Sequence, residues 1–402
     1  MCHFPYSCFF HLLLMYEITR YILCERQVSA ASQDDVARCV NPMSHVKDIS
    51  LLQQQKMNKS NSIVSQLNDT AKMLKNSHNV QFSLQENMLI CYMYQAGFSL
   101  PLAKKCPNYG KQMKVVAMVL SDPNHYLARK AVRETWGLFT HRKDVKVVFI
   151  VGSTNDVWLE QKLRKEQNAF DDIVRANFLD TYTNLTLKTV SILEWVDKYC
   201  WATKYVLKTD DDVFINMPRL LAFVRAHIRY KNVIFGRLSE YTKPHRERNN
   251  KYYVSIMSYE PSQFPNFLTG PAYLISSDVV HKLFEESLRT TFLKLEDVFL
   301  TGIVASKLGI YRVDAIEFVN QRESFSICEV QSSISLHSIR YSEQYDLWEK
   351  LFVCNPACPT FCHIRSNGSL ASSNNLVFIF IIQFIIKYIL SFTYFDSSKT
   401  TM

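Results

Sequence analysis

Residues 204–215 read KYVLKTDDDVFI, and the apolar part of this stretch indicates the fold. Its apolar residues run without alternation, which is typical of a strand buried on both faces. Similar β-branched runs recur at 114–121, 145–153, 232–238 and 311–318. Helical patterns separate these runs at 126–136, 155–167, 185–199 and 218–227. The alternation predicts an α/β fold, a mostly parallel central sheet flanked by helices, with ligands at the carboxyl ends of its strands.

Three adjacent carboxylates, Asp210, Asp211 and Asp212, follow the apolar part of this predicted strand. Between apolar runs they repel one another and lose hydration, which is unfavourable unless a partner compensates. A divalent cation, Mn²⁺ or Mg²⁺, compensates and can also bridge a diphosphate. The alternative is a solvated acidic turn that caps a helix. We expect a metal site because the triplet lies inside an apolar strand, after Lys208.

Glycine spacing and charge exclude several other functions. No two of the nine glycines are closer than seven residues, so the dinucleotide fingerprint, the Walker P-loop and the G-x-S-x-G elbow are absent. The 46 basic and 37 acidic residues give a net charge of +9, and the basic residues are scattered along the chain. We therefore expect no nucleic-acid partner.

Composition divides the 402-residue chain into five parts. Residues 1–24 are a candidate signal or anchor segment. Residues 25–110 are expected to be a stem of low order, because fifteen of the thirty-six residues at 44–79 are Ser, Asn or Gln. A folded domain is expected over 111–345 and a Cys-containing tail over 346–375. Residues 376–395, sixteen of them apolar and only Lys387 charged, predict a transmembrane helix and hence a membrane partner.

The cysteines and the glycosylation acceptors bear on the compartment. Eleven cysteines permit several disulfides. The tail cysteines Cys354, Cys358 and Cys362 with His363 are either disulfide-bonded, in a lumenal chain, or a small zinc site, in a cytosolic one. N-x-[ST] acceptors, which give weak support to a lumenal location, occur at Asn58, Asn68, Asn184 and Asn367.

Two further groups of charged residues stand out. Glu296 and Asp297 precede a helical apolar pattern, where the helix dipole favours anions. From this segment alone, a charged helix start is the simpler interpretation. Arg129 and Arg133 lie four residues apart on one predicted helical face, which can bind phosphate or carboxylate or remain solvated.

Five blocks occur in a characteristic order: RKAVRETW (129–136), FLDTYTNLTLK (178–188), KTDDDVF (208–214), FPNFLTGPAYLIS (264–276) and LEDVFLTG (295–302). Together they resemble the β-1,3-galactosyltransferase family, glycosyltransferase family 31, over about half of the chain. The resemblance implies a GT-A-like nucleotide-sugar-binding fold. It also implies an inverting, Mn²⁺-dependent transfer of galactose or an N-acetylhexosamine from a UDP-sugar to a hydroxyl of a glycoprotein or glycolipid glycan. The expected place is the Golgi membrane, with the catalytic domain lumenal.

The resemblance also implies roles for particular residues. Asp297 would be the base that deprotonates the acceptor. The metal ligands would be Asp212, Asp210 and His337. The residues expected at or supporting the nucleotide are Arg129, Arg133, Trp136, Lys188, Asp210 and Asp211. Substrate contacts are expected from Phe264, Gly270 and Glu296.

Two departures from the family and two alternative functions remain. Phe264 and Phe267 stand where the family commonly has tyrosine, and the clearest predicted span is C-terminal rather than N-terminal. One alternative is a catalytically inactive glycan-binding relative, against which the intact DDD and EDV blocks count. The other is a glycoside hydrolase, but its general acid must hold a proton, whereas a cation-binding cluster must stay ionised.

Overall fold

The computed structural model describes residues 87–320, 322, 325–353 and 358. The predicted segments 1–24 and 376–395 lie outside these residues, as do Cys354, Cys362, His363 and the acceptors Asn58, Asn68 and Asn367. Among the helices of the described part, none has both the length and the apolarity to cross a membrane.

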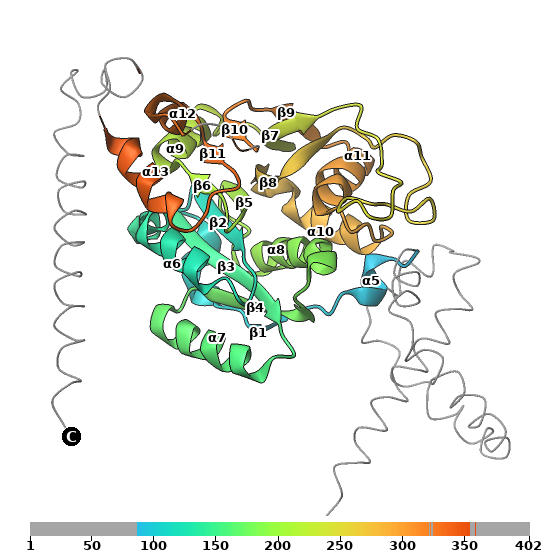
Figure 1. Ribbon diagram of the computed structural model, residues 1–402, viewed down its shortest axis with the longest axis horizontal. Coiled ribbons are helices and arrows are strands. Elements are labelled where there is room, and N and C mark those ends of the chain that lie inside the picture. The colour runs from blue at the N-terminus through green and yellow to red at the C-terminus, as the bar shows by residue number, and fades with distance from the viewer. Residues whose placement is uncertain (1–86, 321, 323–324, 354–357, 359–402) are drawn as a thin grey trace, which may run out of the picture.

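A mixed sheet forms the centre of the molecule (Figure 1), with its strands in the order β1-β4-β3-β2-β5-β8-β7-β9. The strands are β1 (Phe98–Leu100), β2 (Val115–Leu120), β3 (Val145–Ser153), β4 (Ile173–Leu179), β5 (Tyr205–Asp210), β7 (Val233–Ser239), β8 (Phe267–Ser276) and β9 (Tyr311–Asp314). β1 and β8 run antiparallel to their neighbours, and the other strands share one direction. The predicted α/β fold with a mostly parallel sheet is thus confirmed.

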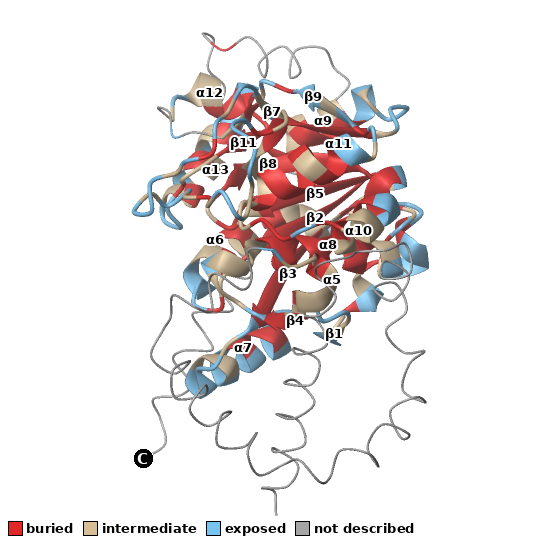
Figure 2. Cartoon of the chain, turned by 90° about the vertical axis from the view of Figure 1, so that its right-hand side faces the viewer, coloured by how far each residue is buried: buried red, intermediate tan, exposed pale blue. Residues whose placement is uncertain are grey.

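Helices cover both faces of this sheet. The helices are α5 (Ile90–Met93), α6 (Tyr126–Glu134), α7 (Val157–Phe170), α8 (Leu185–Tyr199), α9 (Met217–Ala226), α10 (Val280–Leu288), α11 (Ala305–Lys307), α12 (Ile327–Ser332) and α13 (Glu343–Phe352). A π-helical segment, η6 (Val298–Val304), precedes α11. Residues of β2 point alternately into two hydrophobic cores. The first core also contains residues of α8, α10 and η6, and the second contains residues of α6, α9 and α13. Figure 2 shows the central strands buried between these layers.

Helix α8 is buried far more completely than its sequence pattern predicts. The pattern predicts a stripe that includes Leu185, Ile192 and Val196, whereas every residue from Thr186 to Val196 is buried. The reason is that α8 contacts α10 as well as the sheet, and the segment before β2 also covers it: the hydroxyl of Tyr94 and the N–H of Gly97 donate to Glu194. Polar residues of α8 are therefore placed inside the protein, where they need partners.

The folded domain begins earlier than predicted. Residues 87–110 were expected to belong to the stem, but β1 pairs with β4, and Ile90 and Leu102 are buried. A disulfide joins Cys106 to Cys200 at the end of α8. The predicted boundary at 111 is therefore wrong, because these few apolar residues are held by contacts distant in sequence.

The domain also ends later than predicted. Helix α13 continues to Phe352, beyond the expected boundary at 345, and Leu351 is buried. A second disulfide joins Cys328 to Cys358. Cys358 therefore behaves as a disulfide cysteine, and the zinc interpretation of the tail is wrong for this residue.

A second, three-stranded sheet lies beside the first. It contains β10 (Phe318–Val319), β11 (Ser335–Leu336) and β6 (Phe214–Ile215). Leu336 pairs with Phe214, and the N–H of Ile339 donates to the carbonyl of Asp212 at 2.8 Å. This register brings His337 beside Asp212 although the two are far apart in sequence.

Candidate active site

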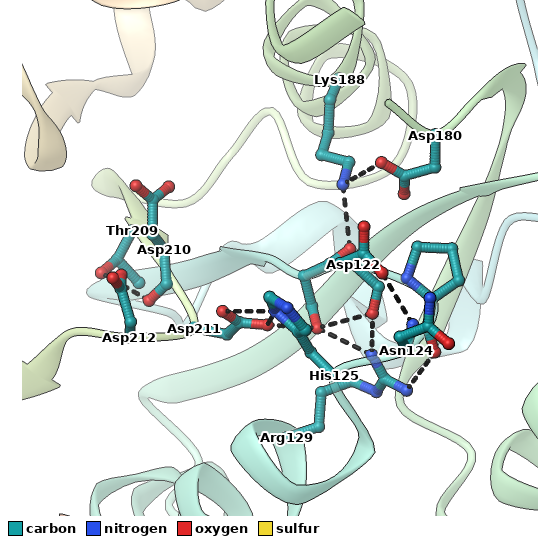
Figure 3. A network of polar contacts seen from close by, with 12 residues as sticks. Asp122, Asn124, His125, Arg129, Asp180, Lys188, Thr209, Asp210, Asp211 and Asp212 are labelled. Atoms are coloured by element: carbon teal, nitrogen blue, oxygen red, sulfur yellow. Dashed lines mark hydrogen bonds and ion pairs between the residues drawn. The ribbon is translucent and has the colours of Figure 1, made fainter. Parts of the chain in front are cut away.

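The carboxyl ends of several parallel strands meet at one edge of the large sheet. Leu120 at the end of β2 pairs with Ile150 of β3 and with Asp210 of β5. The loop 121–125, Asp180 after β4 and the aspartate triplet therefore lie close together, as Figure 3 shows. Ligands of open α/β sheets bind at such edges.

The three aspartates face different partners. Asp211 is buried, accepts a hydrogen bond from Ser121 Oγ at 2.6 Å and lies 3.0 Å from His125 Nδ1. Asp210 accepts from Lys208 Nζ at 2.9 Å. Asp212 lies 3.5 Å from His337 Nε2 (Oδ2 to Nε2), and about half of its side chain is exposed. Figure 3 shows Asp211 turned toward His125, whereas Asp210 and Asp212 lie away from that histidine.

Lys208 connects the triplet to the second acidic pair. Its side chain is 2% exposed, and its ammonium donates to Asp210 Oδ1 at 2.9 Å, to the carbonyl of Gly270 at 2.6 Å and to Glu296 Oε1 at 2.7 Å. Burial alone would lower the pKa of Lys208, but the charges of Asp210 and Glu296 outweigh it and raise the pKa. Lys208 therefore stays charged and holds three chain segments together.

Asp297 lies at the start of its helix, as the sequence predicts. One carboxylate oxygen caps η6 by accepting from the N–H of Val298 at 2.9 Å, and the other accepts from the N–H of Gly270 at 3.0 Å. Burial raises the pKa of Asp297 despite these hydrogen bonds. A raised pKa strengthens a carboxylate as a proton acceptor, and π-helical turns often occur at functional sites.

Asp212 and His337 are the part of the predicted metal site that the structure brings together. Burial alone would lower the pKa of His337, but the hydrogen bond and charge of Asp212 raise it. In the described residues, no group of three or more His, Cys, Asp or Glu side chains converges as a ligand set. A carboxylate and an imidazole suit Mn²⁺, but further ligands would have to come from a bound substrate or water.

The predicted nucleotide ligands Arg129 and Lys188 have protein partners instead. Arg129 is fully buried, pairs with Glu166 at 2.8 Å and donates to Ser121 Oγ at 2.8 Å. Lys188 donates to Asp180 Oδ1 at 2.6 Å and to the carbonyl of Ser121 at 2.9 Å. Both cations thus hold the loop after β2 in place. A supporting role agrees with the prediction for Arg129 and for Lys188, which were both expected at the nucleotide or supporting its site.

Arg133 and Trp136 were predicted at or behind the nucleotide, and the structure gives them roles in the core. Arg133 pairs with Asp172 at 2.8 Å and with Glu166 at 2.7 Å, and its guanidinium lies 4.1 Å from the ring centroid of Phe170. Trp136 is completely buried. Of the two roles predicted for these residues, the structure agrees with support: Arg133 shares Glu166 with Arg129, and Trp136 fills the core.

Of the predicted substrate contacts, Glu296 and Phe264 point into the protein. Glu296 is buried and accepts from Lys208, from Thr189 Oγ1 at 3.1 Å and from the hydroxyl of Tyr273 at 3.0 Å. Phe264 is buried in the first core, 6.3 Å from Phe267 between ring centroids. Direct substrate contact is wrong for both, because these partners already surround them.

Gly270 was predicted to contact substrate, and the structure places it directly against Glu296 and Asp297. A Cβ added to Gly270 would lie 3.1 Å from Glu296 Oε1 and 3.3 Å from Asp297 Oδ2. The residue is a glycine because β8 passes directly over the two carboxylates. Gly270 therefore positions the acidic pair through its backbone.

Sequence reasoning missed several residues of the site. Ser121 and His125, which hold Asp211, lie in a loop without a distinctive pattern. Lys208 was noted only as a residue of the strand that leads to the triplet. The signal that could have identified it is the charge itself, since a lysine inside a buried strand requires carboxylate partners.

Comparison with known proteins identifies relatives of this chain. A family model described as galactosyltransferase matches residues 127–315. The chain is 32% identical over 240 residues to human and mouse beta-1,3-galactosyltransferase 1, covering 59% of this chain and 73% of the relative. It is 30% identical over 258 residues to human lactosylceramide 1,3-N-acetyl-beta-D-glucosaminyltransferase, covering 61% and 67%. Among solved structures, the galactosyltransferase LgtC aligns with a TM-score of 0.32 at 10% identity, covering 60% of this chain and 98% of LgtC.

These relatives define the chain as a glycosyltransferase. It belongs to the galactosyltransferase family, glycosyltransferase family 31, as the five sequence blocks indicated.

Proposed function

We propose that this chain is an inverting β-1,3-hexosyltransferase with a GT-A-like fold. It would transfer galactose or an N-acetylhexosamine from a UDP-sugar to a hydroxyl of a glycan on a protein or lipid. The observation that carries the proposal is the Lys208 bridge, which ties Asp210 to Glu296 and to Gly270, the partner of Asp297. It joins the candidate nucleotide side of the site to the candidate base.

Asp297 is the proposed base. Inversion at the anomeric carbon needs one displacement, so one carboxylate that removes the proton of the acceptor hydroxyl is sufficient. The hydrogen bonds from Val298 and Gly270 fix the orientation of the carboxylate. Its raised pKa supports the role, because a proton acceptor works best when its pKa approaches the pH of the reaction.

We further propose that Asp212 and His337, with Asp210 alongside, hold Mn²⁺ or Mg²⁺. The support is the pairing of a half-exposed carboxylate with an imidazole at the end of β5. When bound, the cation would offset the negative charge that develops on the leaving diphosphate. The protein's own part is to keep Asp212 ionised and His337 turned toward it, which the register of β11 on β6 does.

The proposed compartment is the lumen of the Golgi, with the chain attached to the membrane. The disulfides Cys106–Cys200 and Cys328–Cys358, both within the described residues, support an oxidising environment. The membrane attachment depends on the sequence of residues 376–395, which lie outside the described part.

The test is a sugar-transfer assay with the full chain and UDP-galactose, UDP-N-acetylgalactosamine or UDP-N-acetylglucosamine as donor. Asp297→Asn should lower kcat by at least about a hundredfold while donor binding persists. Asp212→Ala should abolish the dependence of UDP binding on Mn²⁺, measured by calorimetry with and without the metal.

Asp346→Asn is the matched control, because Asp346 is an exposed carboxylate that, among the described residues, pairs with Lys350 on α13. It should transfer sugar like the unmodified protein. Wild-type transfer that is equal with and without Mn²⁺ would contradict the metal proposal, and full activity of Asp297→Asn would contradict the base.

A further inference from the structure

Two exposed aromatic rings share one ammonium group in the described part of the chain. Lys251 Nζ lies 4.9 Å from the ring centroid of Tyr182 and 5.6 Å from that of Tyr252. Tyr182 and Tyr252 are 48% and 49% exposed. Tyr182 belongs to the FLDTYTNLTLK block, in which the sequence pointed only to Lys188 as a site residue; Lys188 is buried and paired with Asp180.

These rings lie beside the segment that carries Asp297. Tyr182 begins the 3₁₀ turn Tyr182–Asn184, which leads directly into α8. In the first turn of that helix Thr186 Oγ1 donates to the carbonyl of Leu293 at 2.5 Å. One turn later, Thr189 Oγ1 donates to Glu296 at 3.1 Å. The start of α8 therefore runs along residues 293–296.

The loop that carries Lys251 and Tyr252 also reaches this segment. The ammonium of Lys294 lies 5.8 Å from the ring centroid of Tyr253. The pKa of Tyr182 agrees with this placement: burial first, then the charges of Tyr252, Asp297 and Asp210, raise it to about 12. Tyr182 is thus near both acidic groups of the site.

The loop itself is built to hold a fixed shape although it has no regular secondary structure. The guanidinium of Arg246 donates to the carbonyls of Val254 at 3.0 Å, Ser255 at 2.9 Å and Tyr259 at 2.8 Å. Val254 is buried in the first core. Because its turns are tied to one side chain, the loop presents Tyr252 in a defined position.

We propose that Tyr182 and Tyr252, with Lys251 between them, form the platform on which a neutral hexose ring of the acceptor glycan stacks. This inference rests on the proposed function and names its acceptor side. The C–H face of a hexose is apolar and packs on an aromatic ring, whereas its hydroxyls need polar partners at the edge. Lys251 is exposed, so its ammonium can leave the ring faces when a sugar stacks on them. The displaced ammonium then donates to a hydroxyl of that sugar.

The experiment uses the full chain with two neutral probes, lactose and benzyl β-N-acetylglucosaminide. Tyr182→Ala and Tyr252→Ala should each raise the KM for the accepted probe by about tenfold, because each removes a stacking face. The donor KM and the slow hydrolysis of donor without acceptor should not change. Tyr182→Phe and Tyr252→Phe keep the ring and should remain within about twofold of the unmodified protein.

Tyr109→Ala is the matched control. Tyr109 is 54% exposed and stacks on Trp201, but its carbonyl accepts from Ala202 just before β5 begins, at the opposite end of that strand from the triplet. The acceptor KM of the Tyr109→Ala variant should equal that of the unmodified protein. An unchanged acceptor KM in both alanine variants at 182 and 252 overturns the platform and leaves the transfer activity standing.

Saturation-transfer NMR with the same probes provides a readout that does not need turnover. The unmodified protein should saturate the ring protons of a bound probe, and both alanine variants should lose that signal while Tyr109→Ala keeps it. No signal from the unmodified protein with either probe overturns the platform. Absence of sugar transfer together with a signal that depends on Tyr182 and Tyr252 supports the platform and counts against the proposed function.

Discussion

The ammonium of Lys208 has three hydrogens and donates to three acceptors, so its hydrogen-bonding capacity is used completely. Its partners come from β5, β8 and the residue before Asp297. Removing one member of a buried ion pair leaves an uncompensated charge, which is far less favourable than losing an exposed pair. At the scale of single residues, Lys208 therefore contributes to both stability and site geometry.

Lys208→Met should lower the free energy of unfolding by about 3–5 kcal/mol, because Glu296 is left buried beside no cation. Urea denaturation measures this loss. Adding Glu296→Gln to the same chain should recover part of it, since the unpaired charge is then gone. Lys350→Met, which breaks a surface pair with Asp346 on α13, should change stability by less than about 1 kcal/mol. A Lys208→Met chain as stable as the unmodified one would disprove this account.

Gly270→Ala should reduce kcat more than stability. The new methyl group would lie within 3.3 Å of a carboxylate oxygen of both Glu296 and Asp297, so the acidic pair must move. We expect kcat to fall by about tenfold or more, since small misplacements of a base are costly. Gly236→Ala is a suitable control, because its Cβ would crowd Tyr273 Cβ at 3.1 Å but no carboxylate. Equal kcat losses in the two variants would argue against a positioning role for Gly270.

At the scale of elements, local patterns identified some strands and not others. β2, β3, β5, β7 and β9 were predicted from apolar, β-branched runs, but β9 contains Arg312 and is largely exposed rather than buried. β4 was missed because Arg175 and Asn177 interrupt its run, and Arg175 is accommodated only by its pair with Glu160. β8 was missed because Gly270 and Pro271 interrupt its apolar run. The interruptions have tertiary causes that a local pattern does not contain.

The same limit explains the candidate site. Asp297 was predicted from the EDV block, and the pairing of Asp212 with His337 from the resemblance to the family. For Lys188, direct binding and a supporting role could not be told apart, because its acid partner, Asp180, could not be recognised as a partner from sequence alone. The same holds for Arg133, whose partner Asp172 is 39 residues away in the sequence. A charged residue in a motif can bind the substrate directly or hold the site in place, and the sequence does not distinguish these roles until the residue's partners are known.

The amino ends of β2 and β3 are joined by a carboxylate whose charge should make stability depend on pH. Burial alone would raise the pKa of Asp144, but hydrogen bonds from Arg142 and Lys114 lower it to about 2. Because the folded pKa lies below the unfolded one, the contribution is present above pH about 4 and is lost as pH falls toward 2.

Asp144→Asn should remove this contribution, which is on the order of 1 kcal/mol near neutral pH because solvent screens the partly exposed pairs with Arg142 and Lys114. Thermal unfolding of the two proteins between pH 2 and 7 measures it. The two curves should converge as the pH approaches 2. Asp278→Asn is the control. It also removes a carboxylate that accepts from a backbone N–H, that of Asn232 at 2.9 Å, but that carboxylate is not paired with two cations as Asp144 is. A constant difference between the Asp144→Asn and unmodified proteins over the whole range would contradict the assignment.

At the scale of the whole molecule, the two cores meet at the site. Asp297 begins a helix of the first core, whereas β6 and β11, which set Asp212 against His337, belong to the second. Lys208 crosses between them from the central strand β5. The relative position of the base and the candidate metal ligands therefore depends on the packing of both layers on one sheet.

The disulfides should hold the outer segments onto this framework without entering the site. Cys106–Cys200 closes a loop of 94 residues and Cys328–Cys358 one of 30, so the first restricts the unfolded chain more. Replacing Cys106 and Cys200 by serine should lower the free energy of unfolding by about 2–5 kcal/mol, and the second replacement by somewhat less. Because β1 still pairs with β4 and Trp195 still donates to the carbonyl of Pro101, the fold should persist and kcat at low temperature should change little. Urea denaturation and the transfer assay on both double variants measure these effects. A large loss of kcat in a Cys106→Ser, Cys200→Ser chain that remains folded would show that the segment 87–110 contributes to the site itself.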